Sequence, residues 1–143
     1  MKISKKVKII VGAMGVIAMV SAANVSTKAS NWYYGAEGDC SISDSNNFKR
    51  CTSIKDTKGT TNATFHVKTL NKTMWSTPSF KLVNSDGATR SVTIDLPKAG
   101  YEGSGSLAGV SPSEAIGHYY YAGLKAAWNQ IGTDTVTAKI SAD

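Results

Sequence analysis

The sequence predicts an all-β domain, either an antiparallel β-sandwich or a small barrel, that follows an N-terminal signal peptide and carries one disulfide bond. Three observations predict this class. The chain after the leader is rich in Ser, Thr, Gly and Asn with interspersed aromatic residues, which is typical of secreted β-domains. Short segments of alternating apolar and polar residues recur between turn signals. The chain has two cysteines, and in an exported protein such a pair forms a disulfide.

Residues 1–22 have the three parts of a secretory signal. Four lysines lie within the first eight residues, fifteen uncharged residues follow, and small residues close the run. Fifteen helical residues span about 22 Å, against roughly 30 Å of bilayer hydrocarbon. We therefore expect cleavage after Ala22, with Ala23 and Ala29 as later alternatives, and a secreted protein without a stable membrane span. The composition is typical of small exported proteins of Gram-positive bacteria.

Removal of the leader changes the charge of the protein. The whole chain has a net charge of +6, but four of its 16 basic residues lie in the leader and all ten acidic residues follow it. The remaining 12 basic and 10 acidic residues give a net charge of +2. This balance predicts no nucleic-acid partner and argues against a strongly cationic lytic peptide. We expect a flexible lead-in over residues 23–31 and one β-rich domain over residues 32–143, which is long enough to bury its own core.

Cys40 and Cys51 are expected to form the disulfide bond. The ring would hold about 12 residues and contribute roughly 3 kcal/mol on the chain-entropy model. Residues 41–47 are turn formers, so we expect the bond to hold a surface loop. The acidic residues nearby fit no calcium-loop spacing and are expected to be solvated; these residues are Glu37, Asp39 and Asp44.

The first half of the domain predicts two strands and two turns. Three successive aromatic residues at 32–34 favour an extended strand. Residues 55–62 predict a turn, residues 63–70 alternate as a half-buried strand, and residues 71–72 predict a second turn. The inward positions of the alternating strand are Ala63, Phe65, Val67 and Thr69.

A hairpin over residues 80–96 is the next predicted unit. Pro78 cannot donate to a sheet, so residues 73–83 form either an edge strand or a segment that breaks between Trp75 and Phe80. Residues 84–87 form a strong turn signal. The returning strand covers residues 91–96, and its inward positions are Val92, Ile94 and Leu96.

The segment after this hairpin predicts a long glycine-rich loop over residues 97–109 and then a helix of about one turn. Ser111 is suited to cap the helix, Pro112 to its first position and Glu114 to a capping box. Gly117 is suited to end it.

Residues 118–128 fit either a strand or a helix, and the three tyrosines and Gly123 favour the strand. A turn over residues 129–133 and a strand over residues 135–141 then complete the chain. The expected inward positions are Tyr120, Ala122, Leu124, Ala126, Trp128, Val136, Ala138 and Ile140.

The sequence contains no strong catalytic motif. Residues 103–108 match G-x-G-x-x-A, but a dinucleotide site needs a strand before this motif and a helix after it, so we expect no cofactor. His66 and His118 are expected to be solvated or hydrogen-bonded, and two histidines do not make a zinc site. A small secreted hydrolase that uses either histidine remains an alternative function.

Exposed aromatic side chains are the remaining functional signal. Alternation predicts that Tyr33, Tyr119 and Tyr121 face away from the core, where tyrosine suits binding to sugars, peptides or membrane interfaces. Equally, these rings could cover a second core or a sheet edge. We expect a non-enzymatic domain that binds a cell-surface glycan, peptide or envelope component. A bacteriocin-like antimicrobial protein is the first alternative.

Overall fold

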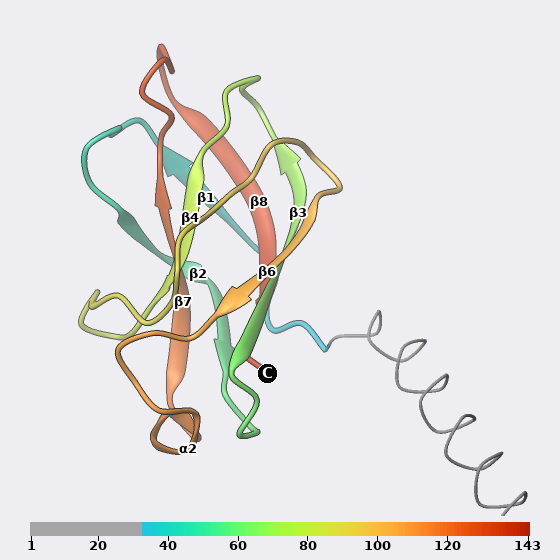
Figure 1. Cartoon of the computed structure of the whole chain (residues 1–143). Coiled ribbons are helices and arrows are strands. Elements are labelled where there is room, and N and C mark those ends of the chain that lie inside the picture. Colours follow the sequence, from blue (N-terminus) through green and yellow to red (C-terminus); the bar gives the residue numbers. More distant parts are fainter. Residues whose placement is uncertain (1–32) are drawn as a thin grey trace, which may run out of the picture. The chain divides into compact units, whose positions relative to one another are not determined.

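The computed structural model describes residues 33–143, which form two antiparallel four-stranded sheets on either side of one hydrophobic core (Figure 1). This confirms the predicted all-β class in its sandwich form. The predicted signal peptide at residues 1–22, the lead-in at residues 23–31 and Trp32 lie outside the described residues, and they stay predictions. No helix in the described part of the chain has the length and apolar character needed to cross a membrane.

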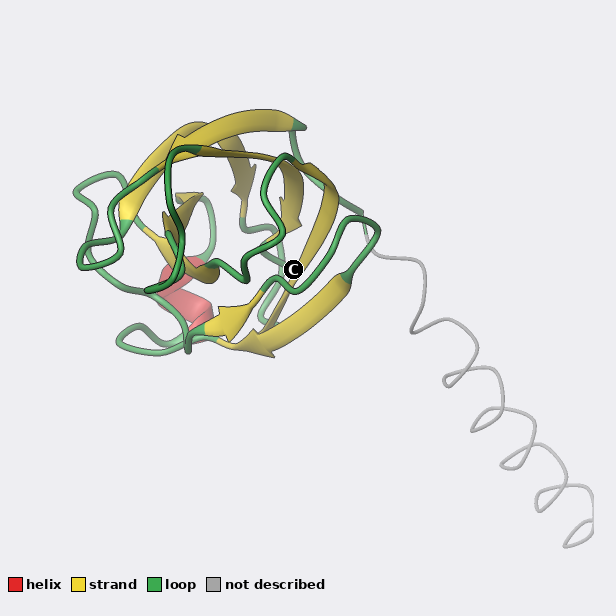
Figure 2. Cartoon of the chain, turned by 90° about the horizontal axis from the view of Figure 1, so that it is seen from above, coloured by secondary structure: helices red, strands yellow, loops and turns green. Residues whose placement is uncertain are grey.

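Each sheet is assembled from strands that are distant in the sequence. One sheet has the order β1 (Gly38–Ile42), β8 (Asp134–Ser141), β3 (Thr64–Lys72) and β6 (Glu102–Ser106). The other has the order β2 (Lys49–Thr57), β7 (Tyr119–Lys125), β4 (Ser79–Val83) and β5 (Ile94–Asp95). Figure 2 views the domain from its upper end and shows the strands around the interior. A short helix, α2 (Pro112–Ala115), lies between β6 and β7 in the chain.

The predicted alternation produces the core. Within residues 118–128, Tyr119–Lys125 form a strand, β7, and not a helix. Phe65 on β3 and Phe80 on β4 meet between the sheets with their ring centroids 5.7 Å apart. The buried positions that alternation predicted correctly are Phe65, Val67, Thr69, Tyr120, Ala122, Leu124, Ala126, Val136, Ala138 and Ile140.

The disulfide has a different role from the predicted one. Cys40 and Cys51 are bonded as expected, but both lie in strands and both are buried. Because β1 and β2 belong to different sheets, the bond joins the two layers of the sandwich and does not hold a surface loop. In the loop between them, Asp44 accepts hydrogen bonds from the backbone N–H groups of Asn46 and Asn47, and the Asn46 bond above all lowers the pKa of Asp44.

One predicted turn and one predicted strand were wrong, and the turn predicted over residues 55–62 begins three residues later than expected. Residues 55–57 continue β2, where Thr57 pairs with Tyr119, and residues 71–72 continue β3, where Lys72 pairs with Val136. Distant partner strands supply hydrogen bonds that local turn propensity does not reveal. Tyr33 and Tyr34 lie outside any strand.

The predicted glycine-rich loop contains a strand, β6, which pairs with β3. Its glycines allow close packing: a Cβ on Gly105 would lie 2.6 Å from Cε1 of the buried Phe65 ring, and a Cβ on Gly103 would lie 2.7 Å from Cε1 of Tyr101. The glycines are therefore needed where neighbouring rings lie against the strand, and they do not mark a flexible loop.

The hairpin over residues 80–96 is confirmed by the pairing of Phe80 with Ile94, but β5 is only two residues long and Val92 is exposed. The strand structure is interrupted before Ser79, where β4 begins, as one of the two expectations at Pro78 predicted. The edge-strand alternative was wrong, because β4 lies between β7 and β5.

The short helix begins as predicted. The Ser111 side chain accepts from the Glu114 N–H, and the Glu114 carboxylate accepts from the Ser111 N–H in a complete capping box. The helix ends before Gly117, which has a φ of +80°.

Asp143 holds the β2–β3 loop against the last residues of the chain. Its Oδ1 accepts from the N–H groups of Gly59 and Thr60 at 2.9 Å and lies 3.5 Å from Nζ of the fully buried Lys58. Burial alone would raise the pKa of Asp143, but these donors and the Lys58 ammonium outweigh it and lower the pKa.

Acid is expected to weaken this contact. A carboxyl group whose pKa is lowered by folding contributes stability above its unfolded pKa of about 3.9, and loses that contribution as the pH falls through the folded value. The free energy of unfolding should therefore fall between about pH 4 and pH 2 more steeply in the unmodified protein than in Asp143→Asn. Urea unfolding across this range measures both slopes, and equal slopes would contradict the expectation.

Candidate binding face

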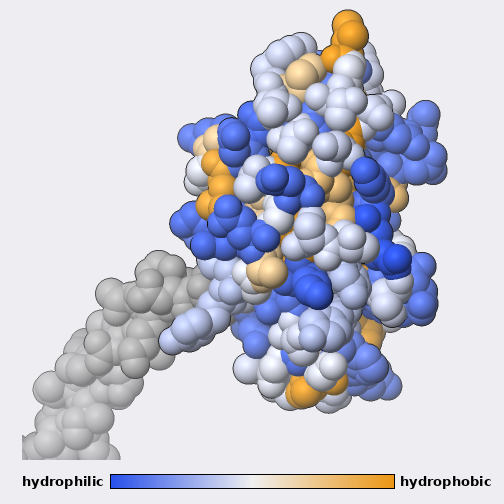
Figure 3. Space-filling model, turned by 180° about the vertical axis from the view of Figure 1, so that it is seen from behind, coloured by the Kyte–Doolittle hydropathy of each residue, from blue (hydrophilic) through white to orange (hydrophobic). Residues whose placement is uncertain are grey.

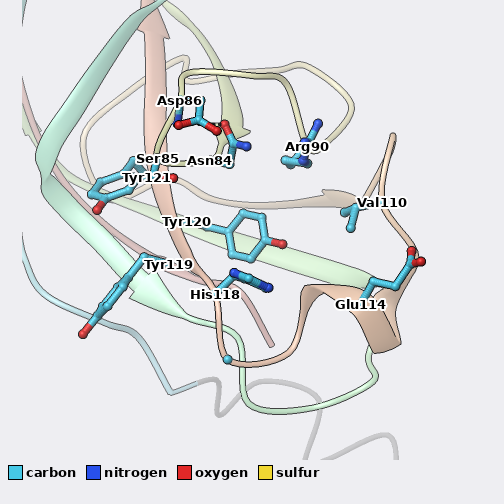
Figure 4. Close-up of a pocket in the computed structure, with 11 residues that line it drawn as sticks. Asn84, Ser85, Asp86, Arg90, Val110, Glu114, His118, Tyr119, Tyr120 and Tyr121 are labelled. Atoms are coloured by element: carbon cyan, nitrogen blue, oxygen red, sulfur yellow. Dashed lines mark hydrogen bonds between the residues drawn. The ribbon is translucent and has the colours of Figure 1, made fainter.

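Two of the three predicted binding tyrosines lie together. Tyr119 and Tyr121 point to one side of β7 and Tyr120 points to the other, as Figure 4 shows. Tyr119 is 54% exposed and Tyr121 is half-buried, so the outer face of this sheet presents both rings. Tyr33 is 93% exposed but precedes the sheets, and its ring makes none of the cation–ring contacts of the described residues.

Basic side chains lie over the rings of this outer face. The Lys55 ammonium is 5.3 Å from the ring centroid of Tyr119, and the Arg50 guanidinium is 5.6 Å from that of Tyr121. At the other end of the face, Phe48 receives two ammonium groups, at 4.1 and 5.2 Å. We call this surface the cation–aromatic face; its residues are Phe48, Arg50, Lys55, Lys81, Tyr119, Tyr121 and Lys125.

Strand register explains the clustering. Gly123 on β7 pairs with Arg50 on one side and with Lys81 on the other. A Cβ at Gly123 would lie 2.9 Å from Cγ1 of Val83 and 3.4 Å from Cγ of Lys81. Because glycine has no side chain there, the Lys81 stem packs close to the strand, and its ammonium reaches Phe48.

The cations of this face have little carboxylate compensation. The ion pairs of residues 33–143 are Lys58–Asp143 and Lys68–Glu102, and neither involves the face. Lys81 donates to the Thr89 hydroxyl at 2.7 Å, which leaves its charge intact. Asp44 lies near enough to Lys125 for that ammonium to contribute to its lowered pKa. The face therefore presents several positive charges supported by aromatic rings.

The outer face of the other sheet is different, because one of its cations is paired with a carboxylate. Glu102 on β6 lies 3.6 Å from Nζ of Lys68 and accepts a hydrogen bond of 2.7 Å from the Tyr34 hydroxyl. That hydrogen bond is the main cause that lowers the pKa of Glu102, while burial and the same bond raise the pKa of Tyr34. Lys139 covers the Tyr34 ring at 5.4 Å.

A pocket of about 450 Å³ adjoins Tyr119 and Tyr121 at the start of β7 (Figure 4). The Tyr120 ring lies at its centre, with His118 on one side and Arg90 on the other. Burial raises the pKa of Tyr120, and the Arg90 charge opposes this. Glu114 lines the pocket but is engaged by Ser111, so the mixed charges here form no clear catalytic set.

The two histidines lie in different parts of the fold. His66 is half-buried on β3, and burial lowers its pKa while Glu102 opposes the shift. His118 is exposed beside β7, where its backbone carbonyl accepts from the Lys58 N–H. The structure therefore does not bring the two imidazoles into one site.

The sequence pattern did not predict the cations of this face or the exposure of Trp128. Cross-strand neighbours such as Arg50 and Tyr121 depend on register, which a single strand pattern does not contain. Trp128 was predicted to face inward, but β7 ends at Lys125 and the Trp128 side chain is 89% exposed. The predicted alternation failed there because the strand had already ended.

The assembled geometry places aromatic rings, which offer contact area, beside cations, which attract negative charge. Within residues 33–143, no cluster of His, Cys, Asp or Glu has the arrangement of a metal site. Protein-family models, curated proteins and solved structures give no match to this chain.

Proposed function

We propose that this protein is a secreted, non-enzymatic domain that binds an anionic polymer of a cell surface or cell envelope through the cation–aromatic face. The observation that carries the proposal is the placement of four cations over three rings on one sheet face, without an ion pair to any of them in the described residues.

Aromatic rings support these cations without neutralising them. A cation over a ring gains about 0.5–1 kcal/mol at an exposed site, whereas a carboxylate partner would cancel the charge. The net charge of +2 expected for the chain without its leader hides this local concentration. A clustered positive surface attracts negatively charged groups and raises association rates at low ionic strength.

The shape of the face favours an extended ligand. Tyr119 and Lys125 lie at the two ends of β7, whose seven residues cover about 20 Å. Arg50 and Lys55 lie along the neighbouring strand β2, opposite Gly123 and Tyr121 of β7. A polymer that carries phosphate or carboxylate groups along its length can contact several of these cations at once, so weak individual contacts add up.

Binding to isolated bacterial envelopes tests the proposal. Arg50→Gln combined with Lys55→Gln is expected to reduce retention about tenfold, because two charge contacts of roughly 0.5–1 kcal/mol each are lost. Tyr119→Ala combined with Tyr121→Ala should cause a similar loss. Retention of the unmodified protein should also fall as salt rises toward about 0.5 M.

Lys68→Gln combined with Lys139→Gln is the matched control, because it removes two cations from the other sheet's outer face. We expect this variant to be retained within about twofold of the unmodified protein. Retention on envelopes stripped of phosphodiester-linked polymers distinguishes the two ligand classes. It should be lost if the ligand carries phosphate and kept if the ligand carries carboxylate. Equal losses in both charge variants, or no retention of the unmodified protein on any envelope, would reject the proposal.

A further inference from the structure

Two exposed tryptophans lie at the upper end of the domain. Trp75 is in the loop between β3 and β4, and Trp128 is in the loop between β7 and β8; their side chains are 77% and 89% exposed. Both line one pocket of about 460 Å³. Tryptophan usually buries most of its large apolar surface, so two solvent-facing rings beside one pocket indicate a ligand site.

The loops that carry these rings are tied to each other. Ser76, which is buried, donates from its hydroxyl to Oε1 of Gln130 at 2.9 Å. The Gln130 Nε2 group donates to the carbonyls of Ile42 at 3.0 Å and Gly132 at 3.1 Å. The pocket is therefore largely formed before a ligand arrives, which reduces the entropic cost of binding.

Polar groups line the same pocket as the two rings. Asp95 accepts from the Ser79 hydroxyl at 3.1 Å through Oδ1, and its second carboxylate oxygen can accept from a ligand. Lys125, the last residue of β7, adds a donor. The remaining polar side chains of the lining combine hydroxyl and amide groups; they are Ser45, Ser76, Thr77 and Asn129.

We infer that this pocket binds a pyranose unit of a saccharide chain. A sugar ring offers C–H groups on its faces and hydroxyl groups around its rim. The faces pack on the electron-rich faces of indole rings, and the hydroxyls pair with groups such as Asp95 and Asn129. This division of apolar rings and polar groups matches the composition of the pocket lining.

A lipid surface is the main competing occupant. Ile131 is 89% exposed in the same loop as Trp128, and Figure 3 shows a hydrophobic side chain projecting at the upper end of the domain. However, a surface that enters a bilayer would gain nothing from the carboxylate and hydroxyl groups of the pocket, because such groups lose their hydration in lipid. The polar lining therefore favours the saccharide.

Titration with soluble chito-, cello- and malto-oligosaccharides tests the inference by calorimetry on the protein without its leader. At least one series should give saturable binding with a dissociation constant at or below about 1 mM. Trp75→Ala and Trp128→Ala should each weaken that binding about tenfold or more. Tyr119→Ala, which alters the cation–aromatic face, should leave oligosaccharide binding unchanged. A failure of this inference is therefore distinguishable from a failure of the anionic-polymer proposal.

Ile131→Ser is the control that separates sugar from lipid. It should leave oligosaccharide binding within about twofold, because Ile131 does not line the pocket. Both tryptophans are exposed, so their replacement should preserve the circular dichroism spectrum. No binding in any series, or binding to phosphatidylcholine vesicles that Ile131→Ser removes, would overturn the inference.

Discussion

Replacing Asp134 with alanine is expected to lower the free energy of unfolding by about 3–4 kcal/mol, as measured by urea denaturation. Asp134 begins β8 and is fully buried. Its Oδ1 accepts from the N–H of Thr73 at 2.9 Å, from the Thr73 hydroxyl at 3.1 Å and from the N–H of Met74 at 3.0 Å. Alanine would remove the acceptor that these three donors share, and the Thr73 N–H would keep only its 3.2 Å bond to the Thr135 carbonyl.

The loss should exceed the worth of a single hydrogen bond. A typical hydrogen bond contributes about 1 kcal/mol net, and Asp134 accepts three of them. Burial lowers the pKa of the nearby Lys72, and the Asp134 charge opposes that shift, so the substitution also removes a favourable charge from the Lys72 ammonium. One substitution removes all of these contributions together, because they depend on the same carboxylate.

Asp134→Asn and Thr73→Val provide the comparison. Asparagine keeps an oxygen acceptor at the same place and should lose less than half as much stability as alanine. Thr73→Val removes one hydroxyl, which also accepts from the N–H of Thr135 at 2.9 Å, and should cost about 1–2 kcal/mol. If Asp134→Ala and Asp134→Asn were equally stable, an oxygen acceptor at this position would not be what holds the loop.

Alternating sequences predicted the central strands well because burial on one face leaves a period of two in the sequence. Phe65, Val67 and Thr69 are buried as expected, and so are Val136 and Ile140. The same rule correctly turned Tyr119 and Tyr121 away from the core. A local sequence pattern is sufficient to predict the buried positions of a strand that has one buried face.

Features that depend on partner strands were not predictable in this way. The disulfide pair was identified, but its position between the two sheets follows from the chain topology and not from the spacing of Cys40 and Cys51. The cations over Tyr119 and Tyr121 come from β2, which pairs with β7 across more than sixty residues of sequence. The cation–aromatic face is therefore a product of register.

Gly105 shows how composition can mislead. Glycine is a poor strand former, so the segment around it predicted a loop. In the structure its φ is not positive and it pairs with Phe65 as an ordinary strand residue. The physical requirement is space, because the Phe65 ring occupies the volume that a side chain at Gly105 would need.

Gly105→Val is accordingly expected to reduce the free energy of unfolding by about 2–3 kcal/mol. Strand propensity alone would favour valine by up to about 1 kcal/mol. The new Cβ would lie 2.6 Å from Cε1 of Phe65 and 2.8 Å from Cγ2 of Val92, and the Phe65 ring is fully buried, so it has no open space into which it can move. Overpacking should therefore outweigh propensity, and chemical denaturation measures the difference.

Ser104→Val is the matched control, because it places the same side chain on the exposed side of the same strand. It should be neutral or slightly stabilising. Phe65→Leu removes part of the ring that a side chain at Gly105 would meet, so Gly105→Val should cost less in that background than in the unmodified protein. An identical cost in both backgrounds would show that the Phe65 ring is not what requires glycine at this position.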